Sequence, residues 1–262
     1  MLPMYTESSR SSSASSSSSS TTNRFSRRST ATAIFNYLRR ICNPSQMDFE
    51  YTSRQMIDLI LAPSKVYDLS KYRKRTRNQW ARDDPAFLVL LFSFMTVSAI
   101  AYGIAFQLSS VGEYLVLIFY TFVQIFVSGA IVATVTSSIA NKRMRILNDA
   151  HSVPQYVEWL YAFDIHANAL FPTFLILSMV QYMLLPLLIK PTYFSCLLAN
   201  GLYATGGLTY VYITHLGFRS MSFLSQDTRI FLMPGGLVLL MCAILTVLDL
   251  NLTRFVVWFV FE

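Results

Sequence analysis

Five long apolar stretches dominate the chain from residue 86 onward. A transmembrane helix needs about 20 mostly apolar residues, and each stretch reaches that length. None of the five contains Glu, Lys or Arg, and Asp249 stands at the last position of the fifth. We therefore expect an all-α, polytopic bundle of transmembrane helices with about five spans. This membrane domain (86–249) would hold spans at residues 86–108, 114–140, 170–189, 193–217 and 230–249.

The composition favours a membrane protein without catalytic chemistry. Only 13% of the 262 residues are charged, whereas soluble domains carry about 25%. The three cysteines, Cys42, Cys196 and Cys242, have neither metal-site spacing nor a disulfide pattern. The sequence also contains no nucleotide-binding glycine loop, nucleophile elbow or HExxH motif. We therefore predict that the protein is not an enzyme, and that it has no metal and no cofactor.

Two segments of different composition precede the first span. Residues 1–33 include a serine tract that cannot bury enough apolar area to fold, which predicts a disordered cytosolic head. Residues 34–85 form a basic cytosolic segment. Within it, residues 45–62 predict an amphipathic helix that Ser45 caps and Pro63 ends. This helix could pack on the protein's own membrane domain or lie on lipid, and the sequence leaves both interpretations open.

A basic run, KYRKRTR, stands a short distance ahead of the first span. Such runs bind anionic lipid, nucleic acid or acidic protein surfaces. Each Lys or Arg near a charged leaflet contributes about 1 kcal/mol, so the position favours lipid or an acidic partner. RNA is the weaker alternative because no RNA-recognition motif accompanies the run. The candidate binding residues are Lys71, Arg73, Lys74, Arg75 and Arg77.

The distribution of Lys and Arg predicts the orientation in the membrane. Of the 21 such residues, only Lys190 and Arg254 fall on the side opposite to the N-terminal segment. Cytosolic loops are enriched in Lys and Arg, so the N-terminus is predicted in the cytosol. Five spans then place residues 250–262 in the lumen as a short tail. Asn251 begins an NLT sequon there, which we expect to be unused because it lies against the bilayer near the chain end.

The polar stretch NQWARDDPAFLVLL (78–91) lies directly against the first span. Proline favours the first helical position, and a carboxylate just before it caps exposed N–H groups at the positive end of the helix dipole. Tryptophan suits a membrane interface, and arginine suits its cytosolic flank. The stretch is therefore interpreted as the start of a span rather than a metal site. Its topology-anchor residues are Trp80, Arg82, Asp83, Asp84 and Pro85.

A second polar stretch, VEWLYAFDIHANALFP, occupies residues 157–172. Asp164 and Asn168 are four residues apart and would share a helix face, whereas His166 would point elsewhere. These residues could bind a metal or transfer protons. A polar helix start that Asp164 caps is the simpler interpretation, and we favour it.

Three motifs in a fixed order carry a family resemblance. They are QMDFEY (46–51), QWARDDPAFLVLL (79–91) and YAFDIHANALFP (161–172). Together with the five spans, they resemble the uncoordinated-fifty family of Golgi membrane proteins over roughly residues 34–255. The resemblance implies a non-enzymatic, multi-pass protein of the Golgi apparatus membrane that supports vesicular protein transport. It also implies links to cell-surface delivery of nicotinic acetylcholine receptors and to exchange factors for Arf GTPases, and RNA binding has been attributed to the family.

The leading hypothesis is a Golgi membrane scaffold that recruits cytosolic trafficking machinery through residues 34–85. Its expected partners are Golgi lipids, Arf guanine-nucleotide exchange factors and receptor cargo. One alternative is a small-molecule or lipid transporter that uses Asn200 and His215. The spans contain no charged group before the terminal Asp249, which weighs against ion-driven transport. The other alternative is a membrane-tethered RNA-binding protein.

Overall fold

The computed structural model describes residues 47–82, 84–146, 155–225 and 228–261. These residues form helices joined by short connections, with no β-strand among them. The all-α prediction is therefore confirmed. The predicted Ser-rich head (1–33), the predicted Ser45 cap and Asp83 lie outside the described residues.

Among the described residues, four helical units are long and apolar enough to cross a membrane. Two of them pass through π-helical turns without a break, and the last begins with a 3-10 turn. The first unit is α4 (Ala86–Ala105). The second is one continuous helix made of α5 (Val111–Phe122), η2 (Val123–Val127), α6 (Ser128–Ile139) and η3 (Ala140–Met144). The third unit consists of α7 (Trp159–Phe174), η4 (Leu175–Val180) and α8 (Gln181–Leu188). The fourth consists of η5 (Thr228–Leu232) and α10 (Met233–Val247).

A fifth long helix, α9 (Tyr193–Arg219), completes the bundle. It has 27 residues but is less apolar than the other four units, because polar residues such as Asn200 and His215 interrupt it. It packs against α7 on one side and α10 on the other. A Cβ atom at Gly207 would lie 2.7 Å from Val238 on α10, so the missing side chain permits close packing. The count agrees with the prediction of about five spans.

The third apolar helix begins earlier than the sequence indicated. We predicted a span at 170–189, but α7 starts at Trp159. The polar side chains of its first turns are buried within the protein, and helix packing therefore extends into a stretch that hydropathy alone assigns to a loop. A short C-terminal helix, α11 (Leu252–Phe261), follows the bundle.

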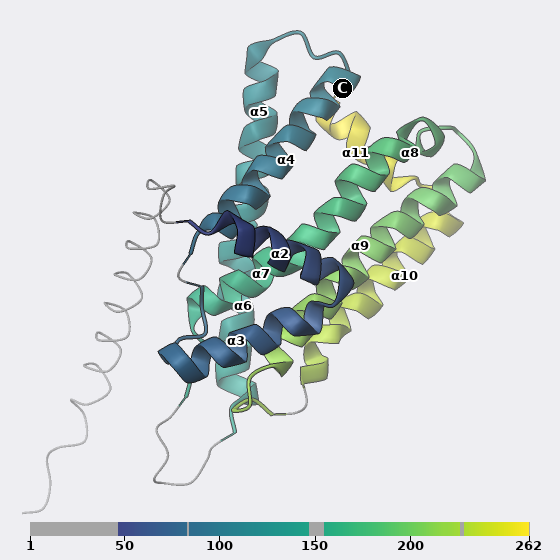
Figure 1. The fold of residues 1–262 in the computed structure, drawn as a ribbon. Helices are drawn as coiled ribbons and strands as arrows, with labels where there is room; N and C mark the ends of the chain where they lie inside the picture. Colours follow the sequence, from purple (N-terminus) through teal and green to yellow (C-terminus); the bar gives the residue numbers. More distant parts are fainter. Residues whose placement is uncertain (1–46, 83, 147–154, 226–227, 262) are drawn as a thin grey trace, which may run out of the picture.

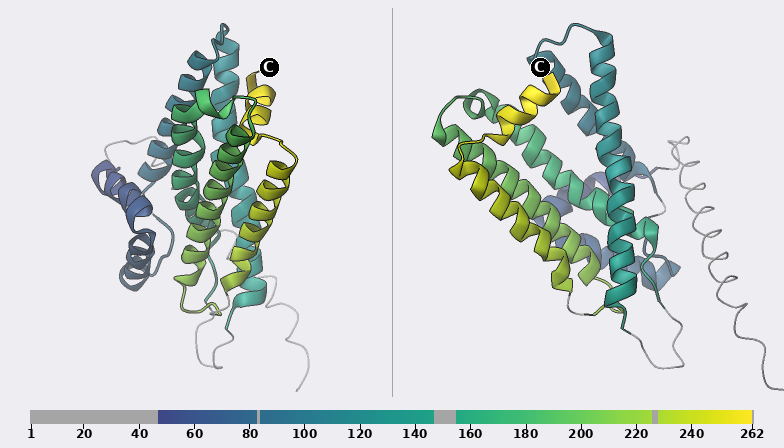
Figure 2. Two further views of the ribbon diagram at one scale, coloured as in Figure 1. Left: turned by 90° about the vertical axis from the view of Figure 1, so that its right-hand side faces the viewer. Right: turned by 180° about the vertical axis from the view of Figure 1, so that it is seen from behind.

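Two helices precede the bundle: α2 (Phe49–Leu61) and α3 (Pro63–Arg77). Asp48 caps α2, since its Oδ1 accepts the Tyr51 N–H at 2.9 Å. Pro63 occupies the first turn of α3, where its missing N–H costs nothing. Both helices lie along one side of the bundle (Figure 2). We refer to α2 and α3 together as the N-terminal platform.

The platform is held by buried contacts on one face only. Val66 and Tyr67 are buried against the bundle, and the Tyr67 hydroxyl donates to the Ile213 carbonyl of α9 at 3.0 Å. On α2, Ile57 and Ile60 remain exposed. The amphipathic segment therefore packs on the membrane domain, as one interpretation predicted, and still presents an apolar face outward.

Candidate functional site at the start of the first span

Arg82 is buried where the chain enters α4, with a relative exposure of 7%. Its backbone N–H donates to Asp164 Oδ2 at 2.6 Å, and its guanidinium group donates to Asn168 Oδ1. The same guanidinium group lies over the Phe87 ring, 4.1 Å from its centroid. The sequence predicted Arg82 on the cytosolic flank of the span and did not indicate that its side chain is buried. Two polar stretches that are far apart in the sequence form one cluster.

The residues that α7 contributes to the cluster lie on one face because of their helical spacing. Asp164 and Asn168 are four residues apart, share a face and are both buried. Asp164 does not cap α7, because the helix begins at Trp159 and the N-cap position belongs to Glu158. The local pattern could not indicate this, since the true partner of Asp164 is the Arg82 backbone.

His166 faces a different set of neighbours. Its Nδ1 lies 2.7 Å from the Tyr210 hydroxyl of α9. On α6, a Cβ atom at Gly129 would lie 2.8 Å from His166 Cδ2, so the ring rests directly against that backbone. His166 therefore helps to join three helices and does not face Arg82.

Trp80 packs inside the protein rather than at a lipid interface. Its ring lies 5.6 Å from that of Tyr161 and 6.2 Å from that of Phe223, centroid to centroid, and it is buried. Lys74 Nζ lies 6.0 Å from the same ring. The interfacial position expected for Trp80 is therefore wrong, because α3 and the start of α7 enclose the ring.

Asp84 starts α4 as the sequence indicated and also makes a second contact. Its Oδ1 accepts the Ala86 N–H at 3.0 Å, next to the buried Pro85. Its Oδ2 accepts the Asp48 N–H at 2.8 Å. The contact of Asp48, which lies in the first of the three motifs, with Asp84 was not predicted from the sequence. All three motifs thus meet in space, through Asp48 with Asp84 and through Arg82 with Asp164.

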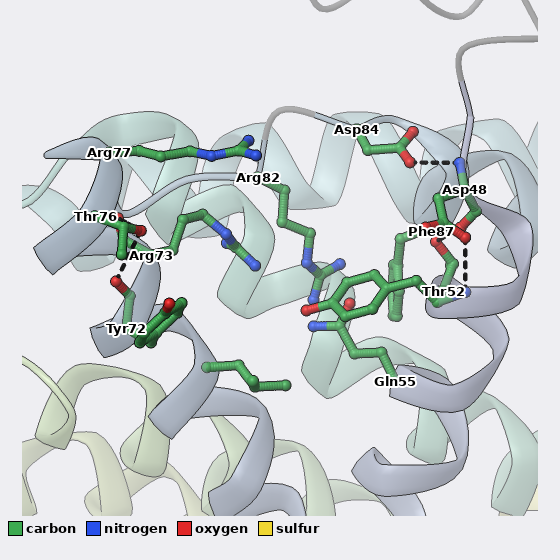
Figure 3. A pocket seen from close by; sticks show the side chains of 12 residues that line it. Asp48, Thr52, Gln55, Tyr72, Arg73, Thr76, Arg77, Arg82, Asp84 and Phe87 are labelled. Carbon is green, nitrogen blue, oxygen red and sulfur yellow. Dashed lines mark hydrogen bonds between the residues drawn. The ribbon is translucent and has the colours of Figure 1, made fainter.

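The basic run of α3 divides into residues with different surroundings. Lys71 pairs with Asp68 at 2.8 Å on the surface, and Arg75 is exposed. Lys74 lies 3.9 Å from Glu158 at the start of α7. The remaining two, Arg73 and Arg77, line a cavity of about 420 Å³ between the two platform helices and the start of α4 (Figure 3).

Within the platform, burial changes the pKa of the Tyr67 side chain. Desolvation raises the pKa of the Tyr67 hydroxyl well above its ordinary value of 10. The neutral phenol is therefore favoured, and it donates to the Ile213 carbonyl. This bond ties α3 to α9.

Asp164 and His166, which the sequence offered for metal binding or proton transfer, have separate partners, and so has the nearby Glu158. Glu158 Oε2 accepts the Ala81 N–H at 3.4 Å, Asp164 accepts from Arg82, and His166 contacts Tyr210. In the part of the chain that the structure describes, no group of three or more His, Cys, Asp or Glu side chains could hold a metal ion.

The polar residues near the opposite end of the bundle hold the C-terminal helix. Asn251 is buried, its Nδ2 donates to the Leu188 carbonyl at 2.8 Å, and its Oδ1 accepts the Arg254 N–H at 3.1 Å. Asn200 Nδ2 donates to the Leu250 carbonyl at 3.0 Å, and its Oδ1 accepts the Leu252 N–H. Both amides therefore have structural partners.

The chain matches the UNC-50 family over residues 37–261, a range that contains every described residue. The chain belongs to the UNC-50 family. Protein unc-50 homolog of Dictyostelium discoideum is 41% identical over 263 residues, which cover 100% of this chain and 98% of that relative. Protein unc-50 of Caenorhabditis elegans is 40% identical over 209 residues (79% and 67%), and the Homo sapiens homolog is 34% identical over 230 residues (87% of each). The resemblance inferred from the three motifs is confirmed.

No solved structure matches the chain. The helix arrangement of this UNC-50 family member is therefore inferred from its own contacts and distances. The motifs that carry the resemblance form one polar cluster, buried at Arg82 and Asp164 and exposed at Asp48, which joins the start of α2 to α4 and α7.

Proposed function

We propose that this chain is a non-enzymatic scaffold of the Golgi membrane that supports vesicular protein traffic. In this proposal, the N-terminal platform faces the cytosol and recruits trafficking machinery such as Arf guanine-nucleotide exchange factors. Receptor cargo would associate with the membrane domain. The UNC-50 membership and the basic platform support the proposal.

One observation carries it: the platform is fixed on one face and exposed on the other. Tyr67 holds α3 to the bundle through a buried hydrogen bond, and Arg82, which follows α3, is bonded to α7. Its outer surface presents Arg75, Ile57 and Tyr72 to the surroundings. A rigid surface with basic and apolar side chains suits a docked acidic partner, because little conformational freedom is lost on binding.

The distribution of charge supports an N-terminus in the cytosol and a C-terminus in the lumen. The end of α9, which carries Arg219, and the end of the helix that continues from α6 into η3, which carries Lys142 and Arg143, lie at the end of the bundle next to α3 (Figure 1). Lys190 follows α8, whose end lies near α11 at the opposite end of the bundle. Loops rich in Lys and Arg stay in the cytosol. This distribution supports a platform on the cytosolic side.

Charge reversal of the exposed basic residues tests this function. A Lys71→Glu, Arg75→Glu protein should insert normally but recruit less exchange factor to Golgi membranes, as measured by imaging and by proximity labelling from the N-terminus. Lys190→Glu is the matched control, because it changes the charge at the other end of the bundle. Unchanged recruitment in the double variant would refute the platform function.

A second candidate function, transport of a small molecule or lipid, is favoured by one cavity. About 350 Å³ of space lies among α4, α5, η4, α8 and α11, next to the buried Gln181. Gln181 Oε1 has no hydrogen-bond partner among the described residues. Saturable flux in reconstituted liposomes that Gln181→Leu abolishes would establish transport. RNA binding through the basic run is the weaker alternative, and a steep fall of affinity with salt would be its signature.

A further inference from the structure

We propose that the cavity between α2, α3 and the start of α4 binds a phosphate monoester of a phosphorylated lipid headgroup. The proposal names a ligand for the platform. It rests on the proposed function, which puts the platform at a membrane surface. The cavity measures about 420 Å³, within the range of small-molecule sites. Three separate segments of the chain supply its walls.

Three arginines converge on this space. Arg73 and Arg77 extend into it from α3, and Arg82 extends into it from the connection to α4 (Figure 3). Guanidinium groups bind phosphate oxygens through paired N–H donors, and a phosphate monoester carries about −1.5 to −2 charges near neutral pH. A cluster of three arginines therefore favours a phosphate over a singly charged carboxylate.

The polar contacts of two of these arginines leave donors available. Arg73 Nη1 donates to the Trp80 carbonyl at 3.3 Å, and the Arg82 guanidinium donates to Asn168. Both acceptors are neutral. Among the described residues, neither Arg73 nor Arg82 forms a side-chain ion pair with a carboxylate. Each guanidinium group has five N–H donors, so most remain for a ligand.

Gln55 provides an independent indication of a ligand. It lines the same cavity from α2 and is only 3% exposed, yet its Nε2 has no hydrogen-bond partner in the described structure. A buried donor without an acceptor is destabilising. An anionic oxygen in the cavity would accept from this amide and from the arginines together.

Two carboxylates also line the cavity, but backbone donors occupy them. Asp48 Oδ1 accepts the Tyr51 N–H, and Asp84 accepts the N–H groups of Ala86 and Asp48. These bonds hold both carboxylates at the starts of α2 and α4, at the edge of the cavity opposite Arg73 and Arg77 (Figure 3). The arginine side is therefore the phosphate side.

The position of the cavity favours a lipid as the carrier of the phosphate. Phe87 lines it from the first turn of α4, the helix with which the chain enters its first span. Tyr51, Leu69 and Tyr72 form an exposed apolar rim. Apolar side chains at the bilayer surface insert among lipids while basic groups bind headgroups. A phosphorylated headgroup could reach the arginines while its acyl chains stay in the bilayer.

The test uses the full chain in nanodiscs of neutral lipid and titrates water-soluble, short-chain lipids. We expect a short-chain phosphatidylinositol monophosphate to bind at least about tenfold more tightly than unphosphorylated phosphatidylinositol, since only the former carries a monoester. Gln55→Leu removes one donor to a charged acceptor and should weaken this binding about tenfold. Arg73→Gln should weaken it similarly. Arg75→Gln is the matched control, because Arg75 lies on the same helix outside the cavity.

Competing ligands identify the source of the phosphate. Inorganic phosphate or a phosphoserine peptide that competes as well as the phosphorylated lipid would overturn the lipid assignment. Equal affinity for the phosphorylated and unphosphorylated lipids, or an equal effect of Arg75→Gln, would overturn the site itself. Ligand-induced shifts in Tm, measured for each variant, separate lost binding from lost folding. The Lys71→Glu, Arg75→Glu protein should still bind the phosphorylated lipid, so failure of the recruitment function is recognised separately.

Discussion

The backbone N–H of Arg82 donates a 2.6 Å hydrogen bond to the carboxylate of Asp164. The side chain of the same arginine continues to Asn168, one helical turn further along α7. One face of α7 thus binds both the backbone and the guanidinium group of a single residue. Because a buried charged group is costly without its partners, this contact fixes where the platform joins the bundle.

Replacement of Asp164 should destabilise the fold strongly. Asp164→Ala removes the acceptor of the Arg82 N–H and leaves this buried donor unpaired, which costs about 1–3 kcal/mol. Asp164→Asn retains an oxygen acceptor and should cost less. Thermal unfolding of the purified protein measures both changes. Asp68→Asn is the control, because its ion pair with Lys71 lies on the surface and contributes about 0–1 kcal/mol. Equal effects of Asp164→Ala and Asp68→Asn would contradict a structural role for the cluster.

A methyl group at Gly129 should disturb the helix junction around His166. The new Cβ would lie 2.7 Å from Phe163 and 2.8 Å from His166, so those rings must shift. Overpacking of this kind typically costs about 1–3 kcal/mol. Gly236→Ala on α10 is a matched control, since no atom lies within 4 Å of its added Cβ. Denaturation in detergent should show a lower Tm for the Gly129 variant only.

The Asn251 sequon should stay unglycosylated. Its side chain is buried and bonded to Leu188 and to the Arg254 N–H, so a folded protein cannot present it. The electrophoretic mobility of protein expressed in eukaryotic cells should not change on treatment with a glycosidase. Asn251→Ala should instead lower stability by about 0.5–2 kcal/mol through loss of the α11 cap. A glycosidase-sensitive band would refute the buried position.

Tyr67→Phe should loosen α3 from α9. The change removes the hydrogen bond to the Ile213 carbonyl, at a cost of about 0.5–1.5 kcal/mol at neutral pH. Burial raises the pKa of the Tyr67 hydroxyl. Its contribution is therefore fully present below the unfolded pKa of about 10 and is lost as the pH rises above it.

The pH dependence gives a second readout for the same variant. The free energy of unfolding of the wild-type protein should fall more steeply above about pH 10 than that of Tyr67→Phe. Other tyrosines titrate equally in both proteins, so the comparison isolates Tyr67. Parallel curves would show that the hydroxyl is not buried in solution.

The sequence predicted the helices better than it predicted their polar contacts. Apolar length indicated the spans, and the Asp84–Pro85 pair correctly indicated the start of α4. The burial of Arg82 and Trp80 was missed because a hydropathy pattern takes account of sequence neighbours only. It therefore assigns a charged or aromatic residue next to an apolar stretch to the edge of the membrane. The partner of Arg82 lies 82 residues further along the chain. The spacing of Asp164 and Asn168 was the available signal, since two polar residues on one helix face need a partner.

The buried polar residues of the platform show a second limit of prediction. An apolar stripe indicated the α2 helix, but Gln55 lies on its buried face and belongs to no periodic apolar pattern. Only the packing of α2 against α3 and the start of α4 creates the space around its amide. A site assembled from three segments has no local sequence signature.

The helix from Val111 to Met144 has 34 residues and is about 51 Å long, whereas the hydrocarbon core is about 30 Å thick. One end must therefore stand clear of the lipid. There, Asn141 exchanges two hydrogen bonds with Val157. The next residue, Glu158, bonds to Ala81 and pairs with Lys74 of α3. In the proposed orientation, this helix sets the height of the platform above the bilayer. A partner that also binds the membrane must therefore span that height, in addition to having a complementary charge.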